Sequence, residues 1–208
     1  MKIIVFGATG TIGQELVKQA LNKGFEVTAF VRSPEKLKSL TSEKLTFVQG
    51  NITNIDDVEK AIKHHKAVFC AIGDGKVGTI RTIGTKHIIK AMKKAGIQRL
   101  ICQTTLGMGE SYGNLNFVWK HIMFGILLKK AFQDHKQQEQ YIIKSDLDYT
   151  IVRPSAFVNG NITNAYKVGF DGTYKNLSLK ITRADVANFM LKQLHTNQYL
   201  KRAVSISN

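Results

Sequence analysis

The chain has 208 residues, of which 43% are hydrophobic and 22% charged, with two prolines and a formal net charge of +15. This composition is ordinary for a soluble globular protein, and the length suits one sizeable core better than two, so we expect one domain over residues 1–208. The two cysteines, Cys70 and Cys102, exclude a disulfide framework and lack the spacing of metal ligands.

No segment has the pattern of a signal peptide or of a membrane span. Four apolar residues precede Gly7, and the longest apolar stretch, residues 116–128, is interrupted by Lys120 and His121. We therefore expect a soluble, cytoplasmic protein without a membrane partner, in which the two thiols stay reduced.

The basic composition raises the question of a polyanionic partner, because Lys and Arg number 30 against 15 Asp and Glu. The positive residues are mostly lysines spread through every segment, so a solvated surface is favoured over nucleic-acid binding. The same positive field would attract a phosphate-bearing cofactor.

Apolar runs alternate with amphipathic patterns as far as residue 154. In chain order we predict a strand at 2–6, a helix at 11–24, a strand at 25–32, a helix at 33–40, a strand at 44–50, a helix at 54–65, a strand at 66–73, a helix at 79–95, a strand at 98–105, a helix at 127–144 and a strand at 148–154. Strands that are nearly continuous in Val, Ile and Phe indicate a parallel sheet covered by helices on both faces. Right-handed crossovers then leave the doubly wound α/β topology, a Rossmann fold.

The tail has a weaker pattern. From residue 157 we predict short strands around Val168 and Leu177, a helix at 183–195 and a terminal strand at 203–207. We interpret residues 157–208 as a small lobe for the substrate within the same domain.

Three glycines follow the first strand at steps of three residues: Gly7, Gly10 and Gly13. In a doubly wound sheet the first strand–helix turn faces the crevice where ligands bind. There Gly7 permits the tight turn, Gly10 lets a pyrophosphate approach the backbone, and Gly13 lets the helix pack on the strand. Free amides and the helix dipole favour phosphate at this point, so we predict dinucleotide binding rather than a merely structural turn.

The end of the second strand indicates which dinucleotide is bound. A site specific for NAD carries an acid there for the ribose hydroxyls. This chain has Arg32 and Ser33 instead, with Lys36 nearby. A guanidinium binds a 2′-phosphate, so NADP(H) is predicted over NAD(H), unless Arg32 is simply a solvated residue at the strand end.

Four stretches carry a resemblance to a known family: GATGTIG at 7–13, VRSPEKL at 31–37, IVRPSAF at 151–157 and ITRADVANFML at 181–191. Together they resemble the atypical short-chain dehydrogenase/reductase superfamily. Within it the chain is similar to the NAD(P)H-binding group of flavin reductase, also called biliverdin-IXβ reductase, from Lys2 to about Tyr199. The resemblance thus covers nearly the whole chain.

The resemblance implies a set of cofactor contacts. The pyrophosphate would lie on the backbone of the first turn, the 2′-phosphate on the end of the second strand, the adenine and its ribose on the ends of the third and fourth strands, and the nicotinamide on the ends of the fifth and sixth. These contacts involve Gly7, Ala8, Thr9, Gly10, Thr11, Ile12, Gly13, Arg32, Ser33, Asn51, Ile52, Ala71, Ile72, Gly73, Thr104, Thr105, Pro154, Ser155, Ala156 and Phe157.

The chain departs from the family in its acid–base residues. The Tyr-x-x-x-Lys pair of typical short-chain dehydrogenases is absent, since Tyr141 is followed by Ser145 and Tyr112 by Asn116, and Ala156 stands where the mammalian flavin reductase has a histidine. Alcohol oxidation by the usual mechanism is therefore not expected. Hydride transfer to an electron-deficient flavin or quinone needs no dedicated acid, and Thr105 is the predicted positioning residue.

The segment after the fifth strand is rich in aromatic residues and Met. We predict that Tyr112, Phe117, Trp119 and Lys120 contribute to an acceptor pocket, although the same stripe suits core packing or a partner subunit in a homodimer. Asp134 and His135 are adjacent on a helix and so do not face one another, which excludes a dyad. A surface role is favoured for His135 over a proton shuttle, and the predicted site contains no metal.

Two functions remain from different classes. The leading one is an NADPH-dependent reductase of a flavin, a quinone or a similar planar acceptor. The other is a non-catalytic NADP(H)-binding redox sensor of the NmrA type, because fold alone does not decide between them. A nucleotide-sugar epimerase ranks third, since it would need the missing Tyr–Lys pair.

Overall fold

The computed structural model describes residues 1–37, 40–73 and 78–208 and has an eight-stranded sheet at its centre. The strand order is β3-β2-β1-β4-β5-β6-β10-β8, and all neighbouring strands are parallel except β10 and β8, which are antiparallel. The strands are β1 Lys2–Phe6, β2 Glu26–Val31, β3 Leu45–Gln49, β4 Ala67–Cys70, β5 Arg99–Gln103, β6 Asp148–Pro154, β8 Lys167–Val168 and β10 Arg202–Ser207. The chain runs outward from β1 to β3 and then returns to β4, so the predicted doubly wound α/β fold is confirmed.

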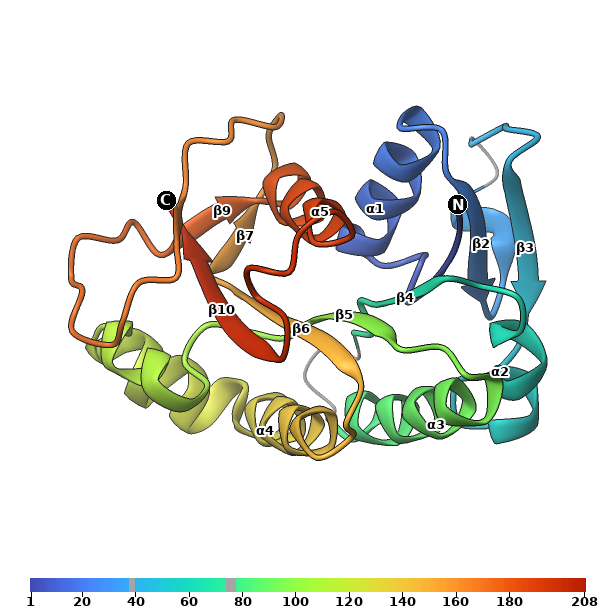
Figure 1. Ribbon diagram of the computed structural model, residues 1–208. Coiled ribbons are helices and arrows are strands. Elements are labelled where there is room, and N and C mark those ends of the chain that lie inside the picture. The colour runs from blue at the N-terminus through green and yellow to red at the C-terminus, as the bar shows by residue number, and fades with distance from the viewer. Residues whose placement is uncertain (38–39, 74–77) are drawn as a thin grey trace.

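Helices cover both faces of the sheet (Figure 1). One layer contains α1 Thr11–Asn22 and α5 Arg183–Lys192; the other contains α2 Ile55–Ile62, α3 Ile80–Ala95 and α4 Lys129–Ile143. Alternate residues of β1 enter the two cores, because neighbouring strand residues point to opposite faces: Ile3 and Val5 join the α1 side, while Ile4 and Phe6 join the α2 side. Burial on both faces explains why β1 is apolar from Ile3 to Phe6.

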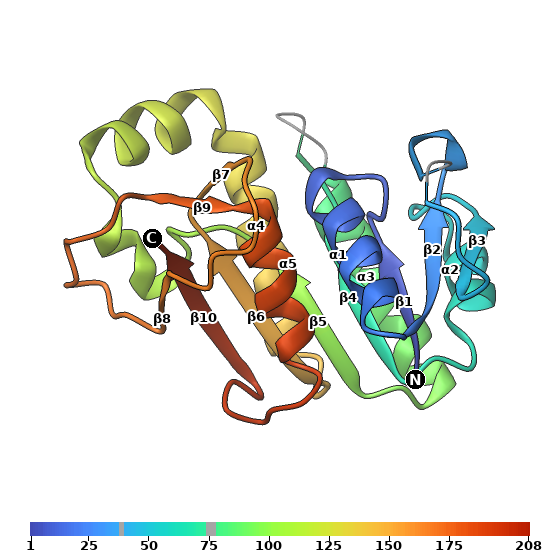
Figure 2. The ribbon, with the colours of Figure 1, turned by 90° about the horizontal axis from the view of Figure 1, so that it is seen from above.

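The parallel strands point toward one edge of the molecule (Figure 2). The turn between β1 and α1 lies at this edge, and so does a π-helix, Val118–Leu127, that precedes α4. The sequence pattern predicts no helix or strand at residues 106–126, whereas they contain most of this π-helix and a 3₁₀ helix, Gly109–Asn114. A π-helix is rare and is frequently found at functional sites.

The tail is only partly separate from the main sheet. A second sheet pairs β7 Ala156–Val158 with β9 Lys180–Thr182, but α5 packs beside α1, and β10 pairs with β6. The strand predicted around Leu177 does not form, because Leu177 packs in a small apolar cluster with Phe124. Likewise, the helix predicted at 33–40 is reduced to a single 3₁₀ turn at Pro34–Leu37, while positions 38 and 39 lie outside the described residues.

Candidate functional site

A cavity of about 610 Å³ opens where the strand order reverses, at the carboxyl edge of the sheet. Crevices at this place bind ligands in open α/β sheets. Most of the predicted cofactor residues line it: Gly7, Thr9, Gly10, Thr11, Ile12, Arg32, Asn51, Ile52, Ala71, Ile72, Gly73, Thr104, Thr105, Ser155, Ala156 and Phe157. The residues outside the lining are Ala8, Gly13, Ser33 and Pro154 among the cofactor set, and Tyr112, Phe117 and Lys120 among the acceptor set.

The glycine turn is required by backbone sterics. Gly7 has a φ of +81°, and a Cβ there would lie 2.3 Å from the carbonyl oxygen of Ala71. A Cβ at Gly13 would lie 2.1 Å from the carbonyl oxygen of Gly7, so α1 can approach β1 only without a side chain. Gly10 caps α1 with no side-chain hydrogen bond, which leaves the first amides of the helix available to an anion. This turn fits the pyrophosphate of a dinucleotide.

The charged side chains that line the cavity are positive in the part of the chain that the structure describes. Among the residues that the structure describes, the charged side chains of the lining are Arg32, Lys36, Arg81 and Arg183, and no Asp or Glu is present. Arg32 and Lys36 are exposed near the end of β2, whereas Arg81 is buried on the first turn of α3. Such a lining is complementary to the phosphates of a dinucleotide.

The loop after β3 is held in place by its own hydrogen bonds. Asn51 Oδ1 accepts from the backbone N–H of Thr53 at 3.0 Å, and the Asn51 backbone N–H donates to Asp57 at 2.9 Å. The carbonyl of Ile52 lies 2.9 Å from Nδ1 of His87. Asn51 and Ile52 are therefore positioned at the cavity wall without a ligand.

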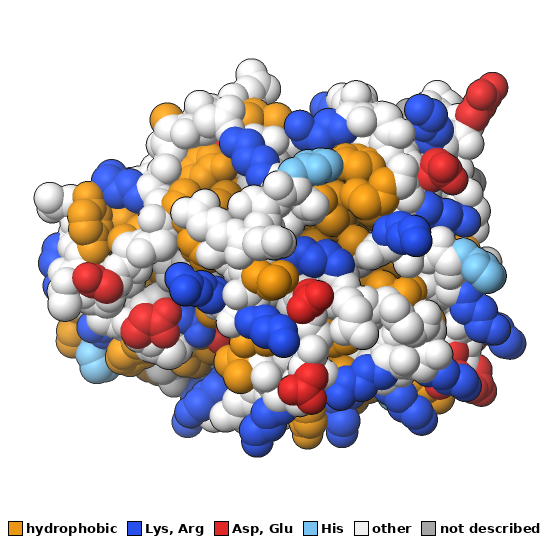
Figure 3. Space-filling view, in the orientation of Figure 1, with side chains coloured by type: hydrophobic (Ala, Val, Ile, Leu, Met, Phe, Trp, Pro, Cys, Tyr) orange, Lys and Arg blue, Asp and Glu red, His pale blue; other side chains and the backbone are white. Residues whose placement is uncertain are grey.

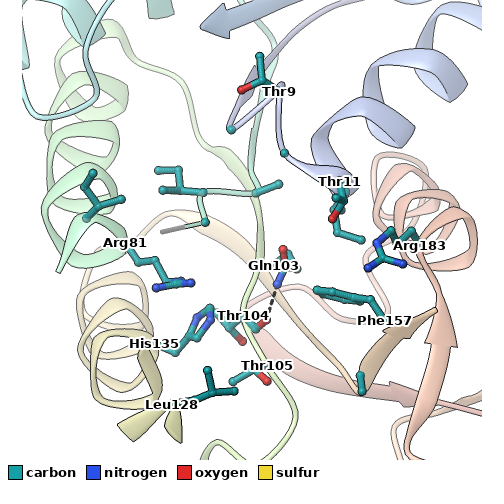
Figure 4. A pocket seen from close by; sticks show the side chains of 18 of the residues that line it. Thr9, Thr11, Arg81, Gln103, Thr104, Thr105, Leu128, His135, Phe157 and Arg183 are labelled. Carbon is teal, nitrogen blue, oxygen red and sulfur yellow. Dashed lines mark hydrogen bonds between the residues drawn. The ribbon is translucent and has the colours of Figure 1, made fainter. Parts of the chain in front are cut away.

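His135 is buried, so the predicted surface role is wrong. It lines the cavity with 8% of its surface exposed, because α4 turns this side toward the sheet. Burial, together with the nearby positive charge of Arg81, lowers the pKa of His135 to about 3. Figure 4 shows Arg81 and His135 side by side on one flank of the cavity, with Phe157 and Arg183 on the other. The imidazole is therefore neutral near pH 7.

The tautomer of His135 follows from its neighbour. Nδ1 lies 3.1 Å from Oε1 of Gln138, and the amide nitrogen of Gln138 donates to Thr85 Oγ1 at 3.0 Å and to Cys102 Sγ at 3.3 Å. Since Oε1 of an amide can only accept, Nδ1 of His135 carries the proton. Nε2 is then an acceptor.

Asp134 has hydrogen-bond partners that differ from those of His135. Its carboxylate accepts from the backbone N–H groups of Arg81 at 3.0 Å and Thr82 at 2.9 Å, at the start of α3. Burial alone would raise the pKa of Asp134, but hydrogen bonds from Thr82 and the α3 backbone outweigh it and lower the pKa. Asp134 thus bonds the start of α3, whereas Nδ1 of His135 lies against Gln138.

The two threonines after β5 differ in their bonding. Thr104 Oγ1 donates to Glu139 at 2.7 Å, and Arg153 holds the same carboxylate through Nε at 3.0 Å and Nη2 at 2.7 Å. Thr105 is half-buried, and its hydroxyl makes a long contact of 3.3 Å with the carbonyl of Leu106. Thr105 is therefore freer than Thr104 to bond a ligand.

An apolar wall closes the end of the cavity beyond these threonines. The lining there includes Trp119 and Phe124, whose ring centroids are 5.4 Å apart, and Leu128. Phe117, in contrast, is 70% exposed, and Lys120 Nζ lies 5.2 Å from the centre of the Tyr112 ring. The π-helix thus turns part of the predicted acceptor segment inward and part outward. The acceptor role of Tyr112, Phe117 and Lys120 stays a prediction.

The cavity also contains residues that the sequence analysis missed. Gln103, Arg81 and Arg183 line it, and Arg183 lies 5.7 Å from the centre of the Phe157 ring while donating to Asn159 at 2.8 Å. Arg81 could have been found from its place on the first turn of a helix that follows a strand end. Arg183 has the same signal, because it is the first residue of α5 and directly follows β9, whereas Gln103 has no comparable pattern.

The two cysteines are opposite one another in the pairing of β4 with β5 and are fully buried as free thiols. The two thiols are therefore neighbours in the sheet, and burial raises the pKa of the Cys102 thiol well above its ordinary value. Within residues 1–37, 40–73 and 78–208, no group of three His, Cys, Asp or Glu residues could hold a metal ion. Over the same residues, none of the helices is long and apolar enough to cross a membrane.

Comparisons with known proteins agree with this geometry. Photosystem II assembly factor Ycf39 of Synechocystis is 30% identical over 168 residues, covering 78% of this chain and 47% of that one. A short-chain dehydrogenase/reductase of Veillonella parvula, solved in complex with NADP, superposes with a TM-score of 0.85 at 21% identity over 100% of this chain and 94% of that one. ChuY, an anaerobilin reductase of Escherichia coli O157:H7, superposes with a TM-score of 0.82 at 22% identity, over 99% of this chain and 96% of that one.

At these identities the two solved structures share the Rossmann fold with this chain. The chain spans between 28% and 60% of the length of the first curated relatives that it matches. The family described as NAD(P)H-binding matches residues 7–197, which is most of the chain and includes the whole glycine turn. The chain therefore belongs to the NAD(P)H-binding family.

Proposed function

We propose that this chain is an NADPH-dependent oxidoreductase that passes a hydride to a flavin, a quinone or a similar planar acceptor. One observation carries the proposal: the same cavity has the glycine turn, Arg32 and Lys36 at one end and Trp119, Phe124 and Leu128 at the other. A volume of about 610 Å³ falls in the range of small-molecule and cofactor sites. The ligands are small molecules rather than nucleic acid, because the cations converge inside a cavity.

The preference for NADPH over NADH rests on Arg32, with Lys36 beside it. Both side chains line the cavity at the end of β2, and no carboxylate lines it among the described residues. A guanidinium that binds a phosphate contributes roughly 1.5–3 kcal/mol, or about 10- to 100-fold in affinity. Arg32→Asp should therefore weaken NADPH far more than NADH in a fluorescence titration. Equal losses for the two cofactors would contradict the assignment.

The chain's own residues orient the reactants. NADPH, when bound, supplies the hydride; the backbone of the glycine turn holds its pyrophosphate, and the apolar wall excludes water from the acceptor. The Arg81 guanidinium, whose Nη1 lies 3.5 Å from Asp134 Oδ2, would also donate to a carbonyl oxygen of the acceptor, and Nε2 of His135 would accept from an N–H or O–H of the acceptor. Because His135 is neutral with a pKa of about 3, the proton that completes reduction comes from solvent.

A second candidate is a non-catalytic NADP(H)-binding redox sensor. The lining has no carboxylic acid among the described residues, and its one histidine cannot act as a proton donor near pH 7. A sensor needs only to distinguish NADP from NADPH by affinity. We propose a cytoplasmic location for either function, in keeping with the two buried, reduced thiols.

The two functions are separated by measuring the absorbance of NADPH with excess FMN, then with a water-soluble quinone, against blanks without protein. Saturable oxidation that is lost in Arg81→Met, with NADPH still bound, supports the reductase. Tight binding of NADPH by the folded protein, without oxidation of NADPH by any acceptor, would overturn it. A large difference between the affinities for NADP and NADPH would then favour the sensor.

A further inference from the structure

The π-helix Val118–Leu127 is apolar on both of its sides. Its inner side lines the cavity through Trp119 and Phe124. We use the name outer face for five exposed side chains on and beside this helix, whose exposed fractions are Phe117 70%, Val118 50%, Ile122 43%, Ile126 73% and Leu127 50%. A helix that is apolar all round is normally covered on every side, and an exposed apolar patch of this kind marks an interaction site.

Basic residues lie on the π-helix and just after it. Lys120 and His121 lie within the π-helix, and Lys129 and Lys130 follow it directly. Residues 116–133 contain no Asp or Glu, so this segment is purely cationic. Figure 3 shows the same excess on the neighbouring surface, where Lys and Arg side chains follow the border formed by α3 and α4.

The charge decides between possible occupants. A second copy of this chain would bring the same lysines together on two molecules that each have a net charge of +15, and like charges repel. An anionic lipid surface offers negative headgroups to the lysines and a hydrocarbon boundary to the apolar side chains. We propose that the outer face docks on an anionic lipid surface and lies in the headgroup region without crossing the bilayer.

Docking would bring the cavity next to the lipid, because the same helix separates the outer face from the apolar wall. The acceptor would then be a lipid-soluble one, such as a quinone with an apolar tail. This last step rests on the proposed reductase function, whereas the docking itself does not. A binding test that needs no turnover therefore separates the two.

The test is flotation of the full chain with vesicles of phosphatidylcholine alone and of equal parts phosphatidylcholine and phosphatidylglycerol. We expect flotation only with the anionic vesicles, and less of it as the salt concentration rises. Trp119 is the single tryptophan of the chain and lies on this helix, so its emission should change on the same vesicles. Equal flotation on both kinds of vesicle, or none at low salt, would overturn the proposal.

Two pairs of variants, each with its control, test whether the outer face is the part of the protein that contacts the vesicle. Ile126→Ser should weaken vesicle binding about tenfold, whereas Ile143→Ser on α4, where Ile143 is 51% exposed, should not. Lys129→Gln with Lys130→Gln should weaken it about 30-fold, because each lysine near an anionic surface contributes a factor of about five. The control, Lys60→Gln with Lys63→Gln, removes the same charge from exposed positions at the end of the molecule that contains α2.

All six substitutions in these four variants lie on exposed positions, and circular dichroism checks that the variants are folded. If both lysine pairs had the same effect, binding would follow net charge alone, and the outer face would not be the docking site. If the protein formed a dimer that Ile126→Ser dissolved, and wild type did not float, a second copy would be the occupant and the proposal would be wrong.

Discussion

The two ends of the cavity are built by different means. At the cofactor end the geometry comes from the backbone, because side chains at Gly7 and Gly13 would collide with carbonyl groups of Ala71 and Gly7. At the acceptor end it comes from side chains that α3, α4, β5 and β6 bring together, such as Arg81, His135 and Thr105. The first kind of site can be seen in a short stretch of sequence, whereas the second exists only after folding.

The acceptor end depends on a buried polar network for its shape. Glu139 lies one helical turn after His135 on α4, and it bonds Arg153 on β6 and Thr104 after β5. The network thus fastens α4 to the sheet and holds His135 against the cavity. A side chain added at Gly7 or Gly13 should therefore disturb the cofactor end. Loss of the Glu139 network should disturb the acceptor end.

Gly13→Ala should have the largest effect and act at the cofactor end. The new Cβ would meet the carbonyl oxygen of Gly7 at 2.1 Å and Cα of Ala8 at 2.7 Å, and both are backbone atoms that cannot turn away. We expect a loss of roughly 4 kcal/mol in the free energy of unfolding by urea, together with loss of NADPH binding. Gly73→Ala is the matched control for the unfolding measurement alone, since its Cβ would meet nothing within 4 Å but the residue lines the cofactor cavity.

Glu139→Leu should have the second-largest effect on stability and should act at the acceptor end. It leaves the buried Arg153 guanidinium with only Glu110, whose side chain is 65% exposed, so the expected cost is about 3 kcal/mol. Glu110→Gln should cost less than about 1 kcal/mol, because an exposed pair contributes little. Comparable losses in urea unfolding for the two variants would show that Glu139 does not anchor α4.

The pH dependence of stability below pH 6.5 reports the burial of His135. Its pKa falls from 6.5 in the unfolded chain to about 3 in the folded one, so only the unfolded chain takes up the proton between these values. The stability is therefore complete above pH 6.5 and is lost as the pH falls toward 3, at roughly 1.4 kcal/mol per pH unit. Between pH 6.5 and about 5 this amounts to about 2 kcal/mol.

His135→Gln should flatten this dependence, as measured by urea unfolding at several pH values. His65 has a pKa lowered by burial as well and will leave a residual slope, which His65→Gln removes. Asp134 and Asp185, whose pKa values lie below the ordinary 3.8, lose their contribution only at lower pH and do not interfere. An unchanged slope in His135→Gln would mean that the imidazole is not buried in solution.

The sequence predicts much of the fold and one half of the site. The apolar strands, the doubly wound topology and the glycine turn follow from local patterns, because burial on both faces and backbone sterics leave local traces. The sequence analysis misses the π-helix and the burial of His135. The burial depends on contacts of α4 with Thr85 and the cysteine strands, distant in sequence from His135. Periodicity alone cannot reveal such contacts.

The smallest effect on stability is expected for substitution of Thr105, which lies where the two ends of the cavity meet. Its hydroxyl bonds the Leu106 carbonyl at only 3.3 Å, so Thr105→Val should change the free energy of unfolding by less than about 1 kcal/mol. If the hydroxyl instead positions the acceptor, Thr105→Val lowers kcat/KM for the acceptor three- to tenfold, roughly the worth of one hydrogen bond, and Thr105→Ser restores it. Unchanged kinetics in Thr105→Val would mean that Thr105 does not position the acceptor. The guanidinium of Arg81 and the imidazole of His135 would then supply the polar contacts of the acceptor ring.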